Sequence, residues 1–308
     1  MRPRVKPSVS APILVLVVFL LTLAETLIPR DYLGMDENPY LAAVVLQLLI
    51  YTVPSLFYCR LRGREFTPKL RLRLFPPSQL LYLWHALVCM TATSALLSAL
   101  MYRIAPEAFS SSSASNAASF AMGSGFFDGL YVIVAFAVLP AVTEEFLFRG
   151  VVTGEYEGLG TGIAVTVSAV MFAMAHFSAV RFPVYFAAGL ILSSVLYATR
   201  SLLAPILLHA VYNGIVLFAE KYVLYIVDKQ NVSMLLLMIL LCAAAVLSAM
   251  LACFEAQSIY RGYAENNVPS EYAEGDRKGA LTHAVEAFFT PAFLILVLLF
   301  IFVAAARR

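Results

Sequence analysis

"VLPAVTEEFLFRG" (Val138 to Gly150) joins a run of apolar residues typical of a membrane-spanning helix to three ionisable side chains within six positions. These are Glu144, Glu145 and Arg149. One ionisable residue at the centre of a membrane helix costs roughly 2.5 to 3.5 kcal/mol, so the three together cost roughly 8 to 10 kcal/mol. The surrounding apolar residues contribute a favourable insertion free energy of only about 3 to 6 kcal/mol. We therefore expect these groups to face one another, partner helices or a water-filled cavity.

Helical spacing pairs one of the two carboxylates with the arginine. Glu145 precedes Arg149 by four residues, which is the favourable order for an ion pair on one helical face. Glu144 is rotated by about 100° and has no such partner in its own helix, which makes it the candidate for chemistry. A second interpretation stays open here: the turn lies at the membrane interface, where long charged side chains reach water at little cost.

The composition predicts an integral membrane protein. Of 308 residues, 61% are hydrophobic and only 13% are charged, whereas about a quarter of the residues in a soluble domain are charged. Several apolar runs approach or exceed the roughly 20 residues that cross a bilayer. We expect an all-α fold, a polytopic transmembrane helical bundle of eight or nine spans. The expected spans are 11–29, 40–58, 79–101, 126–157, 160–180, 183–199, 202–226, 233–254 and 286–305.

The basic residues predict the orientation in the membrane. Six Lys and Arg residues lie between Cys59 and Pro77, and three more lie within the first six residues. By the positive-inside rule, the N-terminus and this loop are cytoplasmic. The first apolar run is longer than that of a typical signal peptide, so we expect a retained anchor. The four cysteines form no CxxC pair and are expected to be free. Membrane lipid is an expected partner, and nucleic acid is not.

Two further pairs of polar or aromatic residues occur at helical spacing. "MFAMAHF" places Phe172 and His176 four residues apart, and "LLHAVYNGI" does the same for His209 and Asn213. Each pair shares one helical face. Counting along the helices places Glu144 about 20 Å and His176 about 22 Å from the turn that joins their spans, and His209 about 14 Å from its own turn. These depths allow the side chains to gather at one site.

Such a set suits hydrolysis without a nucleophilic side chain. A carboxylate and an imidazole around one water form a general-base arrangement. A second histidine with an asparagine one turn away supplies hydrogen-bond donors for a developing oxyanion. Two imidazoles and a carboxylate could instead hold zinc with an open position for water. No HExxH sequence is present, so the metal question stays open. A G-x-S-x-G sequence is also absent, which disfavours a serine mechanism.

The order of these motifs resembles that of the type II CAAX prenyl endopeptidase family, also called the CPBP or Abi family. The resemblance covers roughly residues 126–218, a catalytic helical core. Residues 1–125 are expected to form N-terminal transmembrane helices and loops, and residues 219–308 C-terminal transmembrane helices. The motifs are E-E-x-x-x-R (Glu144, Glu145, Arg149), F-x-x-x-H (Phe172, His176) and H-x-x-x-N (His209, Asn213).

The resemblance implies an intramembrane endopeptidase that cleaves membrane-associated peptides or lipidated proteins, including prenylated CAAX-type substrates. Glu144 and His176 would activate water, and His209 and Asn213 would stabilise the oxyanion. Glu145 would be a required supporting carboxylate. Arg149 would hold Glu145 in place, and Phe172 would also be supporting. The resemblance does not settle whether zinc is required.

Two other functions remain open from the sequence. One is a non-proteolytic immunity or scaffold protein of the same fold. The other is a proton-coupled transporter in which Glu144, His176 and His209 form a relay. Transporters often carry internal repeats, and no such repeat is apparent in this sequence.

Overall fold

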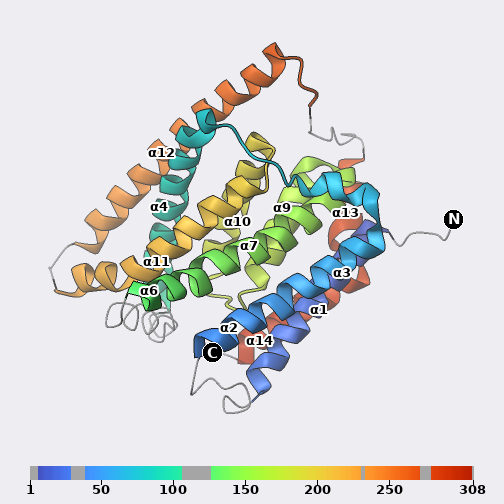
Figure 1. The fold of residues 1–308 in the computed structure, drawn as a ribbon. Coiled ribbons are helices and arrows are strands. Elements are labelled where there is room, and N and C mark those ends of the chain that lie inside the picture. The colour runs from blue at the N-terminus through green and yellow to red at the C-terminus, as the bar shows by residue number, and fades with distance from the viewer. Residues whose placement is uncertain (1–5, 29–38, 106–125, 230–232, 271–278, 307–308) are drawn as a thin grey trace.

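A computed structural model describes residues 6–28, 39–105, 126–229, 233–270 and 279–306 (Figure 1). The regular elements of these residues are helices, without strands, which confirms the all-α prediction. The α-helices are α1 (Pro7–Leu27), α2 (Pro39–Gln47), α3 (Val53–Arg62), α4 (Leu80–Ile104), α6 (Phe126–Ile133), α7 (Leu139–Glu145), α8 (Thr153–Tyr156), α9 (Thr161–Met174), α10 (Phe182–Thr199), α11 (Leu203–Lys229), α12 (Met234–Glu265), α13 (Ala280–Phe288) and α14 (Pro291–Ala306).

Short segments of other helical types join or interrupt these helices. The π-helical segments are η2 (Leu48–Thr52), η6 (Val134–Val138) and η7 (Phe146–Val152). The 3-10 segments are η3 (Arg64–Leu70), η4 (Pro77–Gln79) and η8 (Glu157–Leu159).

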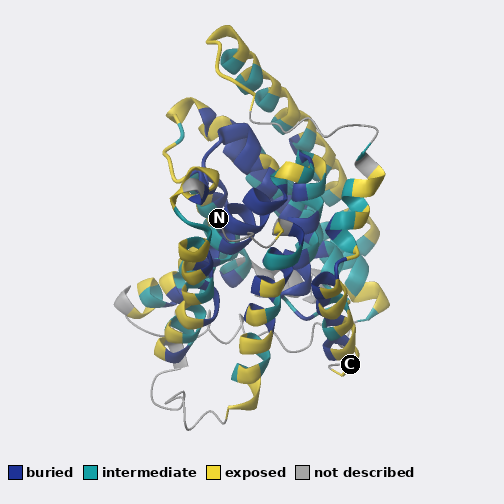
Figure 2. Ribbon diagram, turned by 90° about the vertical axis from the view of Figure 1, so that its right-hand side faces the viewer, coloured by how far each residue is buried: buried dark blue, intermediate teal, exposed yellow. Residues whose placement is uncertain are grey.

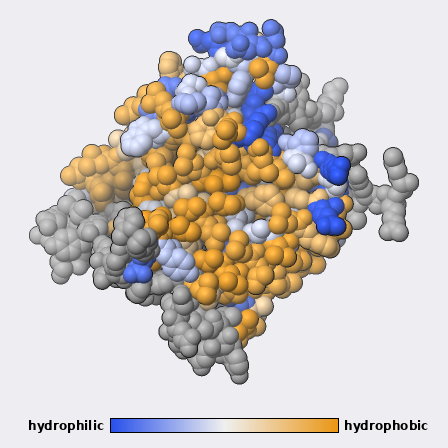
Figure 3. Space-filling model, viewed as in Figure 1, coloured by the Kyte–Doolittle hydropathy of each residue, from blue (hydrophilic) through white to orange (hydrophobic). Residues whose placement is uncertain are grey.

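Six helices of the described residues are long and apolar enough to cross a membrane, and α13 with α14, bent by 59°, would make a seventh. Figure 3 shows an apolar band across one face, with hydrophilic residues toward its edges. The predicted count of eight or nine is not confirmed, because α9 and Leu203–Phe218 of α11 are apolar but short. The six are Ser8–Leu27, Leu41–Arg62, Pro77–Ile104, Asp128–Leu159, Phe182–Thr199 and Met234–Glu265.

Helix α10 lies in the interior of the bundle and packs against α9 and α4 (Figure 1). Helix α11 packs against α7 and η6, and α1 against α14. Buried residues gather inside the bundle, as Figure 2 shows. Helix α12 is an outer helix that packs mainly against α4, and Ser248 is its one buried residue. All four cysteines are free, as expected.

Two of the π-helical segments lie directly before a proline-containing turn. Pro54 follows η2 and Pro140 follows η6. Proline has no N–H and its ring clashes with the carbonyl four residues earlier, so a wider turn relieves both problems. In η7, the carbonyl of Phe148 accepts hydrogen bonds from Oγ1 of Thr153 at 2.9 Å and from Oγ of Ser168 at 2.8 Å. Side-chain hydroxyls thus stabilise the widened turn that carries the arginine of the first motif.

The loop after α3 is tied to the core by ion pairs. Arg62 pairs with Glu155 at 2.7 Å, and Arg71 pairs with Glu157 at 2.6 Å. The backbone N–H of Leu202 donates to the carbonyl of Arg71 at 2.9 Å. These contacts fix the loop relative to α8 and α11 but not relative to a membrane. Its cytoplasmic location therefore stays a prediction, and the first five residues, which share that prediction, lie outside the described part of the chain.

Helices α9 and α10 approach closely at Gly189. A Cβ atom at this position would lie 2.9 Å from both Cα and Cβ of Ala169. Real Cβ atoms essentially never show carbon contacts this short, so only glycine allows the observed packing. Small residues commonly permit such close helix contacts in membrane proteins.

We expect Gly189→Ala to destabilise the fold, because overpacking of this kind typically costs about 1 to 3 kcal/mol. Thermal unfolding in detergent micelles measures the change. Gly262→Ala is the matched control, since a Cβ on this α12 residue meets nothing within 4 Å. Equal midpoints for the two variants would contradict the predicted close contact.

Candidate active site

A fully buried ion pair lies at the centre of the site. Glu145 and Arg149 both have 0% of their surface exposed, and Nη1 of Arg149 donates to Oε1 of Glu145 at 2.9 Å. The pairing predicted from helical spacing is therefore confirmed. Nη2 donates to the carbonyl of Gly189 at 3.1 Å, and the guanidinium lies 4.4 Å from the ring centroid of Phe172. The arginine thus joins its own helical span to α9 and α10.

The same carboxylate oxygen also contacts a histidine of α11. Nδ1 of His209 lies 2.8 Å from Oε1 of Glu145, and His209 is buried. An ionised carboxylate only accepts hydrogen bonds, so Nδ1 of His209 is the donor. Nε2, the second ring nitrogen, is therefore available to other groups. Helical spacing could not predict this contact, because it joins residues of two separate helices.

His176 lies just beyond a helix and not within one. The predicted span 160–180 is wrong at its end, because α9 stops at Met174. Phe177 adopts the left-handed conformation, with φ of 51°, which a continuing α-helix does not allow. Its ring packs on Phe19 of α1, with centroids 4.6 Å apart. The turn therefore depends on a tertiary contact. It contains no glycine or proline from which it could be predicted.

The orientation of the His176 ring is defined by three contacts. Nδ1 lies 2.9 Å from the carbonyl of Phe172, and the ring edge of Phe172 is 4.9 Å away between centroids. Tyr185 stacks on the imidazole at 3.7 Å with an interplanar angle of 17°. A carbonyl cannot donate, so Nδ1 carries the proton and Nε2 of the neutral ring is an acceptor.

Tyr185 is a site residue that the sequence analysis missed. It lies within the apolar α10 sequence, where an aromatic residue is most simply interpreted as core packing. No spacing rule connects it to His176, since the two belong to different elements.

Most of these side chains line a small cavity of about 40 Å³. One water needs at least about 10 to 15 Å³, so the cavity has room for a few water molecules. Nδ2 of Asn213 donates to the carbonyl of Ala137 at 3.4 Å, which holds the amide at the cavity wall. The lining residues are Met90, Phe172, His176, Tyr185, Ala188, Leu192, His209, Tyr212 and Asn213.

Glu144 lies apart from this cavity. It is partly buried, the side chain of Gln47 approaches its carboxyl group, and it interacts electrostatically with His209. Tyr51 is a further neighbour. Within the described ranges, no hydrogen bond or ion pair joins Glu144 to His176. The structure thus brings four predicted residues to the cavity, namely Phe172, His176, His209 and Asn213, and places this carboxylate toward α2.

The zinc alternative from the sequence stays a prediction. No group of three His, Cys, Asp or Glu side chains that could hold a metal occurs among the residues that the structure describes. Nδ1 of His176 contacts a backbone carbonyl, and Nδ1 of His209 contacts Glu145. Both contacts leave Nε2 of each ring available, and the proposal below concerns the side chains alone.

Comparison with known proteins identifies the core that carries this site. Residues 126–215 match the family described as Type II CAAX prenyl endopeptidase Rce1-like. A segment of 91 residues, 27% of the chain, is 35% identical to the membrane-embedded CAAX protease MroQ of Staphylococcus aureus (strain USA300). The match covers 37% of that relative, so the chain spans little more than a third of its length. No solved structure matches the chain.

Residues 126–215 are therefore similar to type II CAAX prenyl endopeptidases. Together with the apolar helices, the match identifies an integral, multi-pass membrane protein.

We expect Arg149→Met to lower the free energy of unfolding by about 3 to 5 kcal/mol, because it leaves the Glu145 carboxylate buried without its cation. The double variant Glu145→Gln/Arg149→Met should lose less than the sum of the two single changes. Unfolding in detergent micelles measures this cycle. Lys6→Met is the control, since Lys6 pairs with Glu286 at the surface, with 75% of its side chain exposed, where a pair contributes only about 0 to 1 kcal/mol. Strictly additive losses would contradict the coupling.

Proposed function

We propose that this protein is an intramembrane endopeptidase that hydrolyses peptide bonds of membrane-associated substrates, including prenylated CAAX-type proteins. The observation that carries the proposal is the cavity lined by His176, His209 and Asn213. Behind it lies the buried pair of Glu145 and Arg149. The family match and the CAAX protease of S. aureus support the class of reaction and of substrate.

His176 is assigned the first proton transfer. Its Nδ1 donates to the carbonyl of Phe172, so Nε2 can accept a proton from a cavity water as the oxygen attacks the substrate carbonyl carbon. The stacked ring of Tyr185 keeps the imidazole in one orientation, which a general base requires. The proton then passes to the leaving amine when the tetrahedral intermediate collapses.

His209 and Asn213 are assigned to the oxyanion. In its protonated form, His209 donates from Nδ1 to Glu145 and from Nε2 into the cavity. The amide of Asn213 uses one N–H on the carbonyl of Ala137 and has a second N–H for the substrate oxygen. Two such donors aimed at the developing charge lower the barrier by electrostatic stabilisation.

Glu144 is assigned to the activation of the same water on the basis of the family resemblance. Its electrostatic interaction with His209 supports a role beside the cavity. Catalytic hydrogen bonds are often long in a free enzyme and shorten in the substrate complex. The assignment therefore requires the Glu144 carboxyl group to turn toward the cavity when substrate is bound.

Single substitutions test these assignments. We expect His176→Ala to lower kcat by about 10²- to 10⁴-fold and Asn213→Ala by about 10²- to 10³-fold. Glu144→Gln should also reduce kcat strongly. Cleavage of prenylated and unmodified peptides by the purified protein in detergent, with and without a chelator, measures the effect. His85→Ala is the control, because His85 lies on α4 away from the cavity lining. Wild-type rates for the cavity variants would refute the proposal.

Substitution of Tyr185 tests how the base is positioned. Tyr185→Phe keeps a stacked ring and should retain most of kcat. Tyr185→Leu removes the stack, and a base that is misplaced by about 1 Å can lose up to about 10²-fold in rate. We expect kcat to fall in the leucine variant while KM changes little. A parallel loss in both variants, or a change in KM alone, would show that the stacking has no positioning role.

A further inference from the structure

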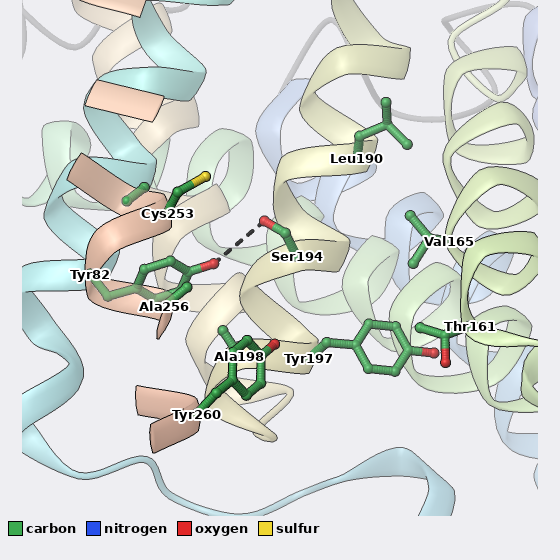
Figure 4. Close-up of a pocket in the computed structure, with 11 residues that line it drawn as sticks. Tyr82, Thr161, Val165, Leu190, Ser194, Tyr197, Ala198, Cys253, Ala256 and Tyr260 are labelled. Carbon is green, nitrogen blue, oxygen red and sulfur yellow. Dashed lines mark hydrogen bonds between the residues drawn. The ribbon is translucent and has the colours of Figure 1, made fainter. Parts of the chain in front are cut away.

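A second cavity lies on the opposite side of α10 from the candidate active site. It has a volume of about 360 Å³ and is lined by residues of α4, α9, α10 and α12 (Figure 4). On α10, Leu190, Ser194 and Tyr197 line it, whereas Tyr185 and Leu192 line the active-site cavity. At about 100° per residue, these two sets lie on opposite faces of the helix. The second cavity is therefore separate from the proposed chemistry.

The lining changes from apolar to polar along the cavity. Figure 4 shows Leu190 near one end, and Tyr197 and Tyr260 near the other. Thr161 also lines the cavity and begins α9 beside the second end. Midway, the hydroxyl groups of Tyr82 and Ser194 approach to 3.5 Å. One end thus suits a hydrocarbon chain, and the other suits a polar group.

The surroundings of the cavity also favour a molecule with a hydrocarbon chain at one end and a polar group at the other. The outer wall is α12, whose Leu247 and Phe254 have 60% and 69% of their surface exposed, as expected for a helix that faces lipid chains. At the hydroxyl end, Glu157 accepts hydrogen bonds from Nη1 of Arg71 at 2.6 Å and from the hydroxyl of Tyr197 at 2.9 Å. Arg261 is exposed one residue beyond Tyr260. The charge of Arg71 is balanced by Glu157, and the charge of Arg261 complements that of a phosphate.

We propose that this cavity binds a membrane glycerophospholipid. One acyl chain lies between α9, α10 and α12, and the phosphate lies at the hydroxyl end near Thr161 and Arg261. A volume of about 360 Å³ is at the lower end of the range of about 300 to 1,000 Å³ for small-molecule sites. It suits a single chain and is too small for a folded segment of a protein partner.

Photolabelling of the purified full chain tests the proposal. The probe is phosphatidylglycerol with a diazirine near the end of one acyl chain, added to nanodiscs that contain the protein. We expect mass spectrometry to find label in residues 190–198 and 252–260. Ala256→Trp and Ser194→Leu, which fill the cavity, should lose most of this label. Leu247→Trp, on the opposite face of α12, should keep it.

Each outcome decides the proposal. Equal labelling of wild type and both filled variants, with all proteins monodisperse on size exclusion, would overturn it. Label spread evenly over the outer face of α12 would also overturn it, because that pattern indicates general contact with the bilayer. Displacement of the phospholipid by a farnesylated peptide would assign the cavity to the substrate instead. Because the readout is binding and not cleavage, it is independent of the proposed protease activity.

Discussion

The buried carboxylate of Glu145 is the interaction on which the arrangement of the core depends. A carboxylate without exposed surface is costly unless neighbouring groups compensate its charge and donate hydrogen bonds to it. Arg149 supplies the compensating charge, and His209 supplies a second hydrogen bond to the same oxygen, Oε1, whereas Oε2 has no hydrogen-bond partner among the described residues. The arginine in turn donates to the carbonyl of Gly189. One charged cluster therefore fixes the central span, α10 and α11 relative to one another.

The packing around this cluster explains several otherwise separate features. The close approach at Gly189 brings α10 near enough for its carbonyl to reach the guanidinium. Phe172 packs against the guanidinium and against both imidazoles, with ring centroids 4.9 Å from His176 and 5.8 Å from His209. The ring and His209 therefore both connect the charged pair to the cavity. The buried ion pair and the side chains of the proposed active site thus pack next to each other in the same core.

Helix α10 has two functional faces under the proposals made above. One face contributes Tyr185 to the cavity in which hydrolysis is proposed, and the other contributes Ser194 to the proposed lipid site. The close contact at Gly189 fixes this helix against α9. The proposed lipid would provide support on the remaining side.

Much of the fold and part of the site could be predicted from the sequence. Apolar composition and run length predicted helices, because hydrocarbon leaves backbone groups no partners outside the helix. Spacing of four residues predicted the pair of Glu145 and Arg149, because that geometry is local. The predicted number of spans is not confirmed, since run length alone does not separate short apolar helices such as α9 from full crossings.

The sequence by itself determined the membrane class, the helical fold and the residue types available for chemistry. Only the tertiary structure decided which carboxylate His209 contacts, where α9 ends and which ring stacks on His176. These contacts join residues far apart in the chain. Periodicity reports which residues share a face of one helix, whereas the partner of that face depends on how separate helices pack against one another.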